Sequence, residues 1–537
     1  MRSFLSIATS VAVFLSQAVD PSMASAETVP TTPIQHVVVI FGENISFDHY
    51  FATYPVALNP PGQPRFTALP STPSVNGLTG LLLTENPNFL NTANGTGAAN
   101  PFRLNRNQAL TADQNHSYGP EEASFDLFNM DLFPSKTGSA GGTPNLYPPV
   151  VDTKGLVMGY FDGNTVTGMW NYAQHFAMSD NSYNSNFGPS TVGALNLTSG
   201  QTNGISATLN GPSSAEVSDG AGGFTLIGDT NPIGDACSGS TGFQISMSGK
   251  NVGDLLNAAA LPWGWFQGGF DLTLTNPNGT TGCNRSTVSP ITGLTETDYV
   301  PHYEAFQFYT TTQNLNHTRP TSVATIGSQA DAANHQYDIH DWFDALSAGN
   351  LPAVSFLKAP YYQTGHPGGS NPLDEQAFVV NVVNTIEASP LWKSTAIIIA
   401  YDDSDGWYDH QPAPISNASY STSDSLSGTD ACGTPGTTAQ LPGPNSGGAP
   451  VNGRCGPGVR TPLLVISPWA KPNFVDHTLT IQTSILSFIE QNWNLGRIGG
   501  GSFDAISNPI TNMFDFSQPT PQNTNLLILS PTTGQPE

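Results

Sequence analysis

Two runs of strand-forming residues, each ending in a pair of oxygen-bearing side chains, constrain the fold of this chain more than any other feature. Residues 37–44 read VVVIFGEN, and residues 396–403 read AIIIAYDD. Continuous apolar runs of this kind are typical of strands buried on both faces of a parallel sheet. In open α/β sheets, ligands bind beyond the carboxyl ends of the strands. The sequence therefore predicts an α/β fold whose doubly wound, mainly parallel central sheet carries both pairs at one edge.

The side chains at these two strand ends would supply hard oxygen ligands for a divalent metal ion and leave positions open for a substrate oxygen. They are Glu43, Asn44, Asp402 and Asp403. Either pair alone is better explained as a helix cap or a solvent-facing loop. Because two such pairs follow two unusually apolar strands, we interpret the chain as a metal-assisted hydrolase. The identity of the metal is left open.

Other segments fit the same architecture. We expect strands at 36–41, 353–357, 396–400 and 463–466, and helices at 374–387 and 478–493. Alternation of strands and helices favours a doubly wound sheet with helices packed on it. Stretches rich in Gly, Ser, Thr and Asn carry the cysteines, and we expect them to be insertions near 199–300 and 411–458 within one domain, 27–517. Residues 518–537 are expected to form an extended C-terminal tail.

The N-terminus resembles a secretory signal peptide, residues 1–26. Met1-Arg2 is followed by an apolar stretch over 4–19 and by Ala24-Ser25-Ala26, a small-x-small cleavage pattern. No later stretch approaches the roughly 18 apolar residues of a membrane span. We therefore expect an exported, soluble protein without stable membrane insertion, either periplasmic or secreted. Its oligomeric state is open.

Charge and cysteine content narrow the function further. The chain holds 40 acidic against 15 basic residues, a formal charge of −25, which disfavours binding to nucleic acid or to anionic membranes. Four cysteines in an exported chain predict disulfides. Proximity favours Cys237 with Cys283 and Cys432 with Cys455, although other pairings are open. A cysteine metal site is disfavoured because no close C-x-x-C pair occurs.

A Gly-Pro turn supplies a candidate nucleophile. Gly188-Pro189-Ser190 precedes a short helical stretch, so Ser190 would lie at a helix N-terminus, where N–H groups and the dipole stabilise a phosphate. A bound cation would lower the pKa of its hydroxyl. The alternatives are that Ser190 only caps the helix, or that Thr191 is the nucleophile.

Three loop histidines are candidates for the general acid and for phosphate contacts: His116, His302 and His366. Imidazolium can protonate a leaving oxygen or neutralise phosphate charge below neutral pH. Any one of them alone is better explained as a surface histidine. As a set they indicate a functional site only in combination with the acidic pairs and Ser190.

Four separated blocks resemble a family of bacterial phosphoesterases that includes phospholipases C and respiratory-burst-inhibiting acid phosphatases. They are VIFGEN with SFDHYF at 39–51, FGPS at 187–190, YDD through GWYDH at 401–410, and ISPWA through VDHT at 466–478. The resemblance implies an alkaline-phosphatase-like core, a metal ion and a covalent phosphoenzyme. By position, it makes Glu43, Asn44, Ser190, Asp402 and Asp403 the metal ligands and Ser190 the nucleophile.

Two departures from the family pattern favour its acid phosphatase branch and bear on the substrate. Phospholipase relatives continue the nucleophile motif with Pro-Asn-Arg, where this chain has Val192-Gly193-Ala194. Close relatives carry paired histidines where this chain has His302-Tyr303, so a phenol replaces one phosphate contact. We predict an exported acid phosphatase acting on phosphate monoesters through a phosphoserine. The alternative is a phospholipase C acting on head-group phosphodiesters.

Two other functions were weighed. A sulfatase would need a C-x-P-x-R motif, and Cys455-Gly456-Pro457-Gly458-Val459 has Val in place of Arg. A non-catalytic exported binding protein on the same scaffold is suggested by the Asn-, Thr- and Gly-rich loops. Retention of all the acidic ligands and of Ser190 argues against it.

Overall fold

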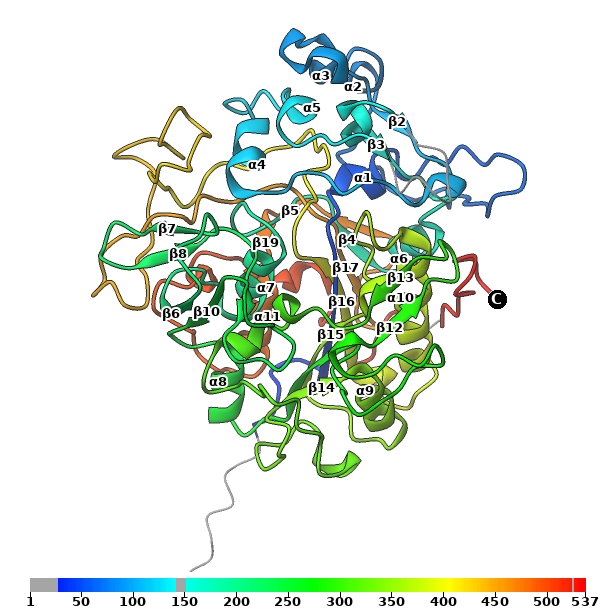
Figure 1. The fold of residues 1–537 in the computed structure, drawn as a ribbon. Helices are drawn as coiled ribbons and strands as arrows, with labels where there is room; N and C mark the ends of the chain where they lie inside the picture. Colours follow the sequence, from blue (N-terminus) through cyan, green and yellow to red (C-terminus); the bar gives the residue numbers. More distant parts are fainter. Residues whose placement is uncertain (1–27, 142–150, 524–525) are drawn as a thin grey trace, which may run out of the picture.

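A central sheet of eight strands organises the computed structural model, which describes residues 28–141, 151–523 and 526–537 (Figure 1). The strand order is β14-β11-β15-β1-β16-β17-β4-β18. The strands are β1 (His36–Gly42), β4 (Ala177–Ser179), β11 (Trp263–Gln267), β14 (Gln336–Asp338), β15 (Val354–Lys358), β16 (Thr395–Tyr401), β17 (Leu463–Ile466) and β18 (Phe474–Asp476).

The register of the three central strands sets the position of the site. β1 runs parallel to β15 on one side and to β16 on the other, and Gly42 pairs with Tyr401. The next residues, Glu43 and Asp402, therefore leave the sheet at the same edge. β17 is antiparallel to both β16 and β4, whereas the other pairings are parallel. The predicted α/β fold with a mainly parallel central sheet is confirmed.

Helices cover both faces of this sheet (Figure 1). One group comprises α6 (Thr167–His175), α9 (Ile339–Ser347) and α10 (Pro372–Glu387), and the other α7 (Ser190–Ser199), α8 (Val252–Ala258) and α11 (Thr483–Asn492). The helix expected at 478–493 was predicted too long, because its first residues form β19 (Thr480–Ile481), which pairs with β5 (Ser182–Tyr183).

Short helices form a cap beyond the carboxyl end of β1 (Figure 1). They are α1 (Phe47–Phe51), α2 (Leu81–Thr84), α3 (Pro87–Leu90), α4 (Tyr118–Ser124) and α5 (Phe133–Lys136), with the two-stranded pair β2 (Phe102–Arg103) and β3 (Gly159–Tyr160) beside them. Side-chain amides hold much of this cap. Asn88, for example, donates to the Met130 carbonyl (2.8 Å) and accepts from the Phe133 N–H (3.0 Å).

The first expected insertion holds small sheets and also one strand of the core. Its own strands are β6 (Ile205–Leu209), β7 (Glu216–Ser218), β8 (Phe224–Leu226), β9 (Asn231–Pro232), β10 (Gln244–Met247), β12 (Ser286–Val288) and β13 (Thr295–Thr297). β11 lies within the same range but belongs to the central sheet, because its aromatic run Trp263–Gln267 is wholly buried. The range 199–300 is therefore not entirely an insertion.

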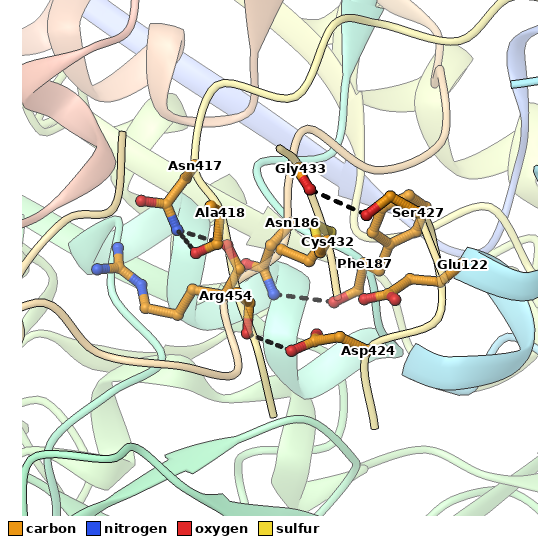
Figure 2. Close-up of a disulfide and its surroundings, with 12 residues drawn as sticks. Glu122, Asn186, Phe187, Asn417, Ala418, Asp424, Ser427, Cys432, Gly433 and Arg454 are labelled. Carbon is orange, nitrogen blue, oxygen red and sulfur yellow. Dashed lines mark hydrogen bonds between the residues drawn. A yellow bond between two sulfur atoms is a disulfide. The ribbon is translucent and has the colours of Figure 1, made fainter. Parts of the chain in front are cut away.

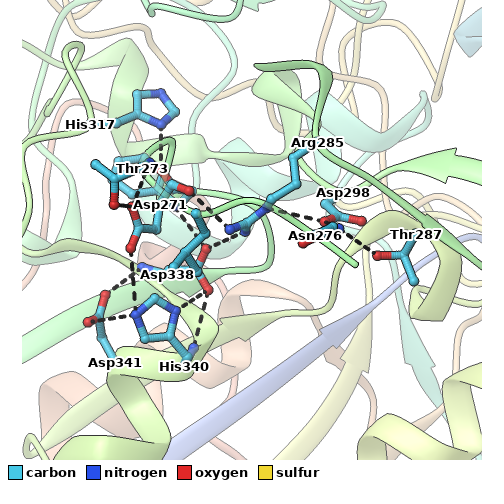
Figure 3. Close-up of polar contacts among 12 residues, drawn as sticks. Asp271, Thr273, Asn276, Arg285, Thr287, Asp298, His317, Asp338, His340 and Asp341 are labelled. Atoms are coloured by element: carbon cyan, nitrogen blue, oxygen red, sulfur yellow. Dashed lines mark hydrogen bonds and ion pairs between the residues drawn. The ribbon is translucent and has the colours of Figure 1, made fainter. Parts of the chain in front are cut away.

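A buried ion-pair network ties this insertion to the edge of the sheet (Figure 3). Arg285 contacts Asp338 at the end of β14 (2.8 Å) and Asp298 (3.2 Å), and it donates to the Asp271 carbonyl (3.0 Å). Because these groups are buried, loss of one partner would leave a charge unpaired. The network fixes the insertion against the scaffold.

Both disulfides join the pairs that sequence proximity favoured, Cys237–Cys283 and Cys432–Cys455. The second lies beside Asn186 and Phe187, which lead into the Gly-Pro turn (Figure 2). There the Phe187 N–H donates to the Cys455 carbonyl (3.1 Å). The disulfide therefore supports the segment that carries the candidate nucleophile.

The predicted signal peptide, residues 1–26, lies outside the described residues. The predicted C-terminal tail can be compared with the structure. The stretch from Gln518 contains no helix or strand among its described residues, but it is packed against α10 and does not extend freely. Leu529 is fully buried, and the Leu527 N–H donates to Glu387 (2.7 Å). Among the helices that the structure describes, none is long and apolar enough to span a membrane.

Candidate functional site

The two acidic strand ends meet as predicted. The Asn44 N–H donates to Asp402 Oδ1 (3.0 Å), and the Asp403 N–H donates to the same oxygen (2.8 Å). Asn44 has a left-handed φ of 64°, which Asn tolerates better than other non-glycine residues and which turns its side chain back towards β16. Glu43, Asn44, Asp402 and Asp403 are all buried.

Ser190 is the first residue of α7 and points into this cluster. The preceding turn places Gly188 at φ 120°, a conformation for which glycine is suited. The Ser190 hydroxyl lies 3.1 Å from Glu43 Oε2, 3.4 Å from Asn44 Oδ1 and 3.2 Å from Asp403 Oδ2. The structure thus brings together four of the five predicted ligands directly, and Asp402 joins them through its contact with Asn44.

The donor set fits a divalent cation on two grounds. Oxygen–oxygen separations of 3.1–3.4 Å match the edge of an octahedron, which is about 3.0–3.4 Å for metal–oxygen distances of about 2.1–2.4 Å. Burial and the neighbouring Asp402 raise the pKa values of Glu43 and Asp403 well above their usual range. Both acids would therefore tend to hold protons, and a cation in the cluster would keep them ionised.

Lys358 is a member of the site that sequence reasoning missed. It is the last residue of β15, and its buried ammonium pairs with Glu43 and lies 3.5 Å from Asp402 Oδ2. The ammonium also lies 4.6 Å from the ring centres of Phe41 and Tyr303. The only sequence signal was a lysine ending an apolar strand. Glu43, Asp402 and Asp403 supply three carboxyl groups against this one ammonium, so a bound cation would balance their charge.

His116 lies at the edge of the cluster, between two further carboxylates. Its Nδ1 is 3.2 Å from Asp405 and 3.5 Å from Asp113, and its Nε2 is 3.5 Å from the Asn44 amide. Burial lowers the pKa of His116, but the charges of Asp403, Asp405 and Asp113 outweigh burial and hold it well above its usual value. Asp405 was not predicted from the sequence, although it follows the second acidic pair by two residues.

The other two predicted histidines lie near the same cluster. The His366 ring is 6.0 Å from that of His116, and its Nε2 is 3.2 Å from the Asn44 amide. His302 follows Pro301 and packs against the edge of Tyr303. Burial lowers the pKa values of both. Asp113, His116 and His366 hold ligand-type atoms within 4.8 Å of one another, so these histidines line one side of the site.

Supporting groups hold the turn at Gly188, Pro189 and Ser190 in place. Glu121 accepts from the Gly188 N–H (3.0 Å) and from the Ser404 hydroxyl (2.6 Å), which links the turn to the loop after β16. Thr191, the alternative nucleophile, is engaged elsewhere, because its hydroxyl donates to Asp229 (2.9 Å). Cys455, the residue considered for a sulfatase, is bound in a disulfide and offers no free thiol.

An open cavity of about 560 Å³ lies beside the cluster. Its walls come from the turn before α7, from the His116 loop and from both expected insertions, and they include His116, Ser117, Pro189, Ser213, Asp229 and Ser423. Most of these side chains are small or polar. Both insertions thus form part of the wall of this cavity.

Comparisons with known proteins agree with the motif blocks. A hemolytic phospholipase C from Pseudomonas aeruginosa is 24% identical over 92% of this chain and 58% of its own length. A non-hemolytic phospholipase C from the same organism is 30% identical over 32% of this chain and 24% of its length. A Mycobacterium tuberculosis phospholipase C A is 28% identical over 36% and 35%, respectively. The matches thus span between a quarter and three fifths of these relatives.

Solved structures that align with the chain do so at low scores. An alkaline phosphatase superfamily protein from Vibrio parahaemolyticus covers 81% of this chain and 80% of its own, at 11% identity and a TM-score of 0.29. A murine ectonucleotide pyrophosphatase/phosphodiesterase covers 65% and 95%, at 13% identity and a TM-score of 0.30. The model of the Phosphoesterase family matches residues 34–496, which include every block and site residue described above. The chain therefore belongs to the Phosphoesterase family.

Proposed function

We propose that this protein is an exported, metal-dependent phosphatase that hydrolyses phosphate monoesters through a phosphoserine at Ser190. One observation carries the proposal: the Ser190 hydroxyl, at the N-terminus of a ten-residue helix, faces three buried ligand-type oxygens from two strand ends. A structural cap would have no need of these buried carboxylates.

In the proposed reaction, the Ser190 hydroxyl gives its proton to the Glu43 carboxylate that it contacts (3.1 Å), and its oxygen forms a new bond to phosphorus. The bond to the leaving alcohol breaks, and the alcohol oxygen takes up a proton from a histidine. The N–H groups at the start of α7 and the helix dipole stabilise the phosphate's negative charge. Water then attacks phosphorus and gives a proton to the Ser190 oxygen, which leaves as the hydroxyl, and inorganic phosphate is released. The Gly188 N–H bond to Glu121 keeps the turn in the orientation that this attack requires.

The metal would be held by Glu43, Asn44, Ser190, Asp402 and Asp403. When bound, a divalent cation lowers the pKa of the serine hydroxyl and neutralises charge on the phosphate. Lys358 contributes a fixed positive charge next to Glu43 and Asp402 whether or not the ion is present.

The pKa shifts of the three histidines favour two different roles, phosphate binding and proton donation to the leaving group. His116, held protonated by the surrounding carboxylates, supplies positive charge to the phosphate. His302 and His366, whose pKa values are lowered by burial, become neutral below the usual value of 6.5 as pH rises. If either protonates the leaving alcohol, hydrolysis is fastest at mildly acidic pH.

A phospholipase C acting on head-group phosphodiesters is the second candidate, because the relatives named above are phospholipases C. A non-catalytic binding protein is the third, and the convergence of Ser190 on three acidic or amide side chains disfavours it.

The test compares wild type with Ser190→Ala on p-nitrophenyl phosphate and on p-nitrophenyl phosphorylcholine, between mildly acidic and neutral pH. The proposal expects wild type to hydrolyse p-nitrophenyl phosphate and Ser190→Ala to lose that rate by a factor of about 10³ or more. It also expects that wild-type protein quenched in acid during turnover carries a covalently bound phosphate. Turnover by Ser190→Ala at the wild-type rate would refute the nucleophile. A rate only on the phosphorylcholine ester would shift the assignment to phospholipase C.

A further inference from the structure

Three neighbouring parallel strands end at one buried ammonium group. β15, β1 and β16 are adjacent in the sheet, and Lys358, Glu43 and Asp402 lie at or just beyond their carboxyl ends. The register pairs Ile40 of β1 with Leu357 of β15, so Lys358 leaves the sheet at the same edge as the two carboxylates. Its side chain is 1% exposed and theirs are 0% exposed. Lysine is almost never buried to this extent unless it is paired.

This ammonium is surrounded as a bound metal ion would be. It pairs with Glu43 Oε1, lies 3.5 Å from Asp402 Oδ2 and donates to the Gly42 carbonyl (3.4 Å). The ring centres of Phe41 and Tyr303 each lie 4.6 Å from the same nitrogen. Two carboxylate oxygens and one carbonyl oxygen are hard ligands of the kind that divalent metal ions prefer. We call these five groups the cation cage.

The oxygens of the two carboxylates are divided between the cage and the predicted ion. Glu43 Oε2 faces the Ser190 hydroxyl (3.1 Å), whereas Glu43 Oε1 faces the ammonium. Asp402 Oδ1 accepts from the N–H groups of Asn44 and Asp403, whereas Asp402 Oδ2 faces the ammonium. Among the residues that the structure describes, Glu43 Oε1 and Asp402 Oδ2 have no hydrogen-bond partner. The ammonium is therefore the group that compensates these two buried oxygens.

A simple structural ion pair would match one ammonium with one carboxylate. Here one ammonium lies between two carboxylates, and one of these, Glu43, extends its other oxygen to the position predicted for the metal. A lysine ammonium is a compact point charge on a flexible stem, so it can occupy the position of an ion. The arrangement resembles two adjacent cation positions that share the Glu43 carboxylate.

We propose that the Lys358 ammonium fills a second cation position of the candidate site, so that the protein holds one exchangeable divalent ion beside a cation that belongs to its own chain. Glu43 bridges the two positions, with one oxygen for each. A chelator therefore removes only one of the two cations. This inference rests on the proposed function for the first ion, whereas the second position does not depend on turnover.

The experiment counts the Mn²⁺ ions bound per folded chain after equilibrium dialysis, in wild type and in Lys358→Ala. Alanine removes the ammonium and leaves space for an ion within the cation cage. We expect one ion per wild-type chain and two per Lys358→Ala chain. Two metal ions that share a site lie about 3.5–4 Å apart. Electron paramagnetic resonance should therefore show a spin-coupled pair in Lys358→Ala and an isolated ion in wild type.

Two further variants are controls. Lys358→Met removes the charge but fills the same space, so the count should stay at one. Lys471→Ala removes an ammonium that also lies 4.6 Å from a ring centre, that of Phe474, but that donates to the Asn512 amide (3.2 Å). Its count should stay at one as well. If Lys358→Ala needs an ion to fold, added Mn²⁺ should restore the folded state seen by circular dichroism, because an ion that binds only the folded chain stabilises it.

The proposal is overturned if wild type binds a coupled pair of ions, if Lys358→Ala binds no more ions than wild type, or if two ions in Lys358→Ala are uncoupled. A Lys358→Ala chain that stays unfolded in Mn²⁺ would overturn it as well. A different result would contradict the proposed function instead: no ion in wild type but one in Lys358→Ala would support the cation cage and refute metal dependence of the native protein.

Discussion

Replacing Gly193 with alanine tests how the fold places the nucleophile. Gly193 lies in α7, one helical turn after Ser190, and its Cα faces the backbone of Asp402. A Cβ at Gly193 would lie 2.1 Å from the Asp402 carbonyl oxygen, whereas real Cβ contacts are essentially never under 3.0 Å. Because the obstacle is backbone, α7 must retreat by about 0.9 Å. Ser190 moves with it, and its distance to Asp403, now 3.2 Å, grows to about 4 Å.

Two effects follow, and they differ in size. A misplacement of about 1 Å in a catalytic group can lower kcat on the order of 10²-fold. The free energy of unfolding should fall by only about 0–2 kcal/mol, because an overpacking cost of about 1–3 kcal/mol is offset by about 1 kcal/mol from the better helix propensity of alanine. Initial rates on p-nitrophenyl phosphate and urea unfolding measure the two separately.

Gly168→Ala in α6 is the matched control. Its Cβ would meet only the flexible Gln376 side chain, at 3.2 Å, so the rate should stay at the wild-type value. If Gly193→Ala kept the wild-type kcat, the contact between α7 and the end of β16 would not determine the position of Ser190, and the reasoning would be wrong.

Three further predictions concern metal binding and stability. Glu43→Gln removes one of three buried carboxylates and should reduce metal retention at least about tenfold, measured as metal content after dialysis; unchanged content would place the metal elsewhere. Lys358→Met leaves Glu43 and Asp402 without their ammonium and should lower the free energy of unfolding in chelator by about 3–5 kcal/mol; urea unfolding checks this, and an equal free energy would contradict the pairing. His49 is buried against Trp407 (ring centres 3.9 Å apart), and burial lowers its pKa to about 3 from 6.5. The unfolded chain therefore takes up a proton that the folded chain does not, so this contribution to stability is complete above pH 6.5 and is lost as pH falls towards 3, by about 2 kcal/mol at pH 5. His49→Asn should lose less stability between pH 7 and pH 5 than wild type, and an equal loss would show that other groups account for it.

Local sequence patterns determined the elements that build the site. The apolar runs of β1 and β16 predicted two buried strands, and the paired acids after them predicted where a ligand would bind. The Gly-Pro turn predicted a helix starting at Ser190, which is where α7 begins. The predictions of the two strands and of the helix start succeeded because strand burial, turn chemistry and helix starts depend mainly on residues close in sequence.

Other features depended on which distant segments the fold brings together. β11 was not predicted, because it lies in a loop-rich range and its short aromatic run has no periodicity that distinguishes a core strand from an insertion. The antiparallel direction of β17 could not be read from its four apolar residues, which suit either direction. Packing of Leu527 and Leu529 on α10 was likewise invisible in a polar, proline-containing tail.

The candidate site likewise depends partly on local sequence and partly on tertiary contacts. The sequence by itself determined which side chains stand at the ends of β1 and β16 and at the start of α7, because each is fixed by its own strand or turn. Only the tertiary structure placed Lys358 between Glu43 and Asp402, put Asp405 beside His116 and pressed Gly193 against the Asp402 backbone. Those contacts depend on strand order and helix packing between residues far apart in the chain, and no local pattern encodes them.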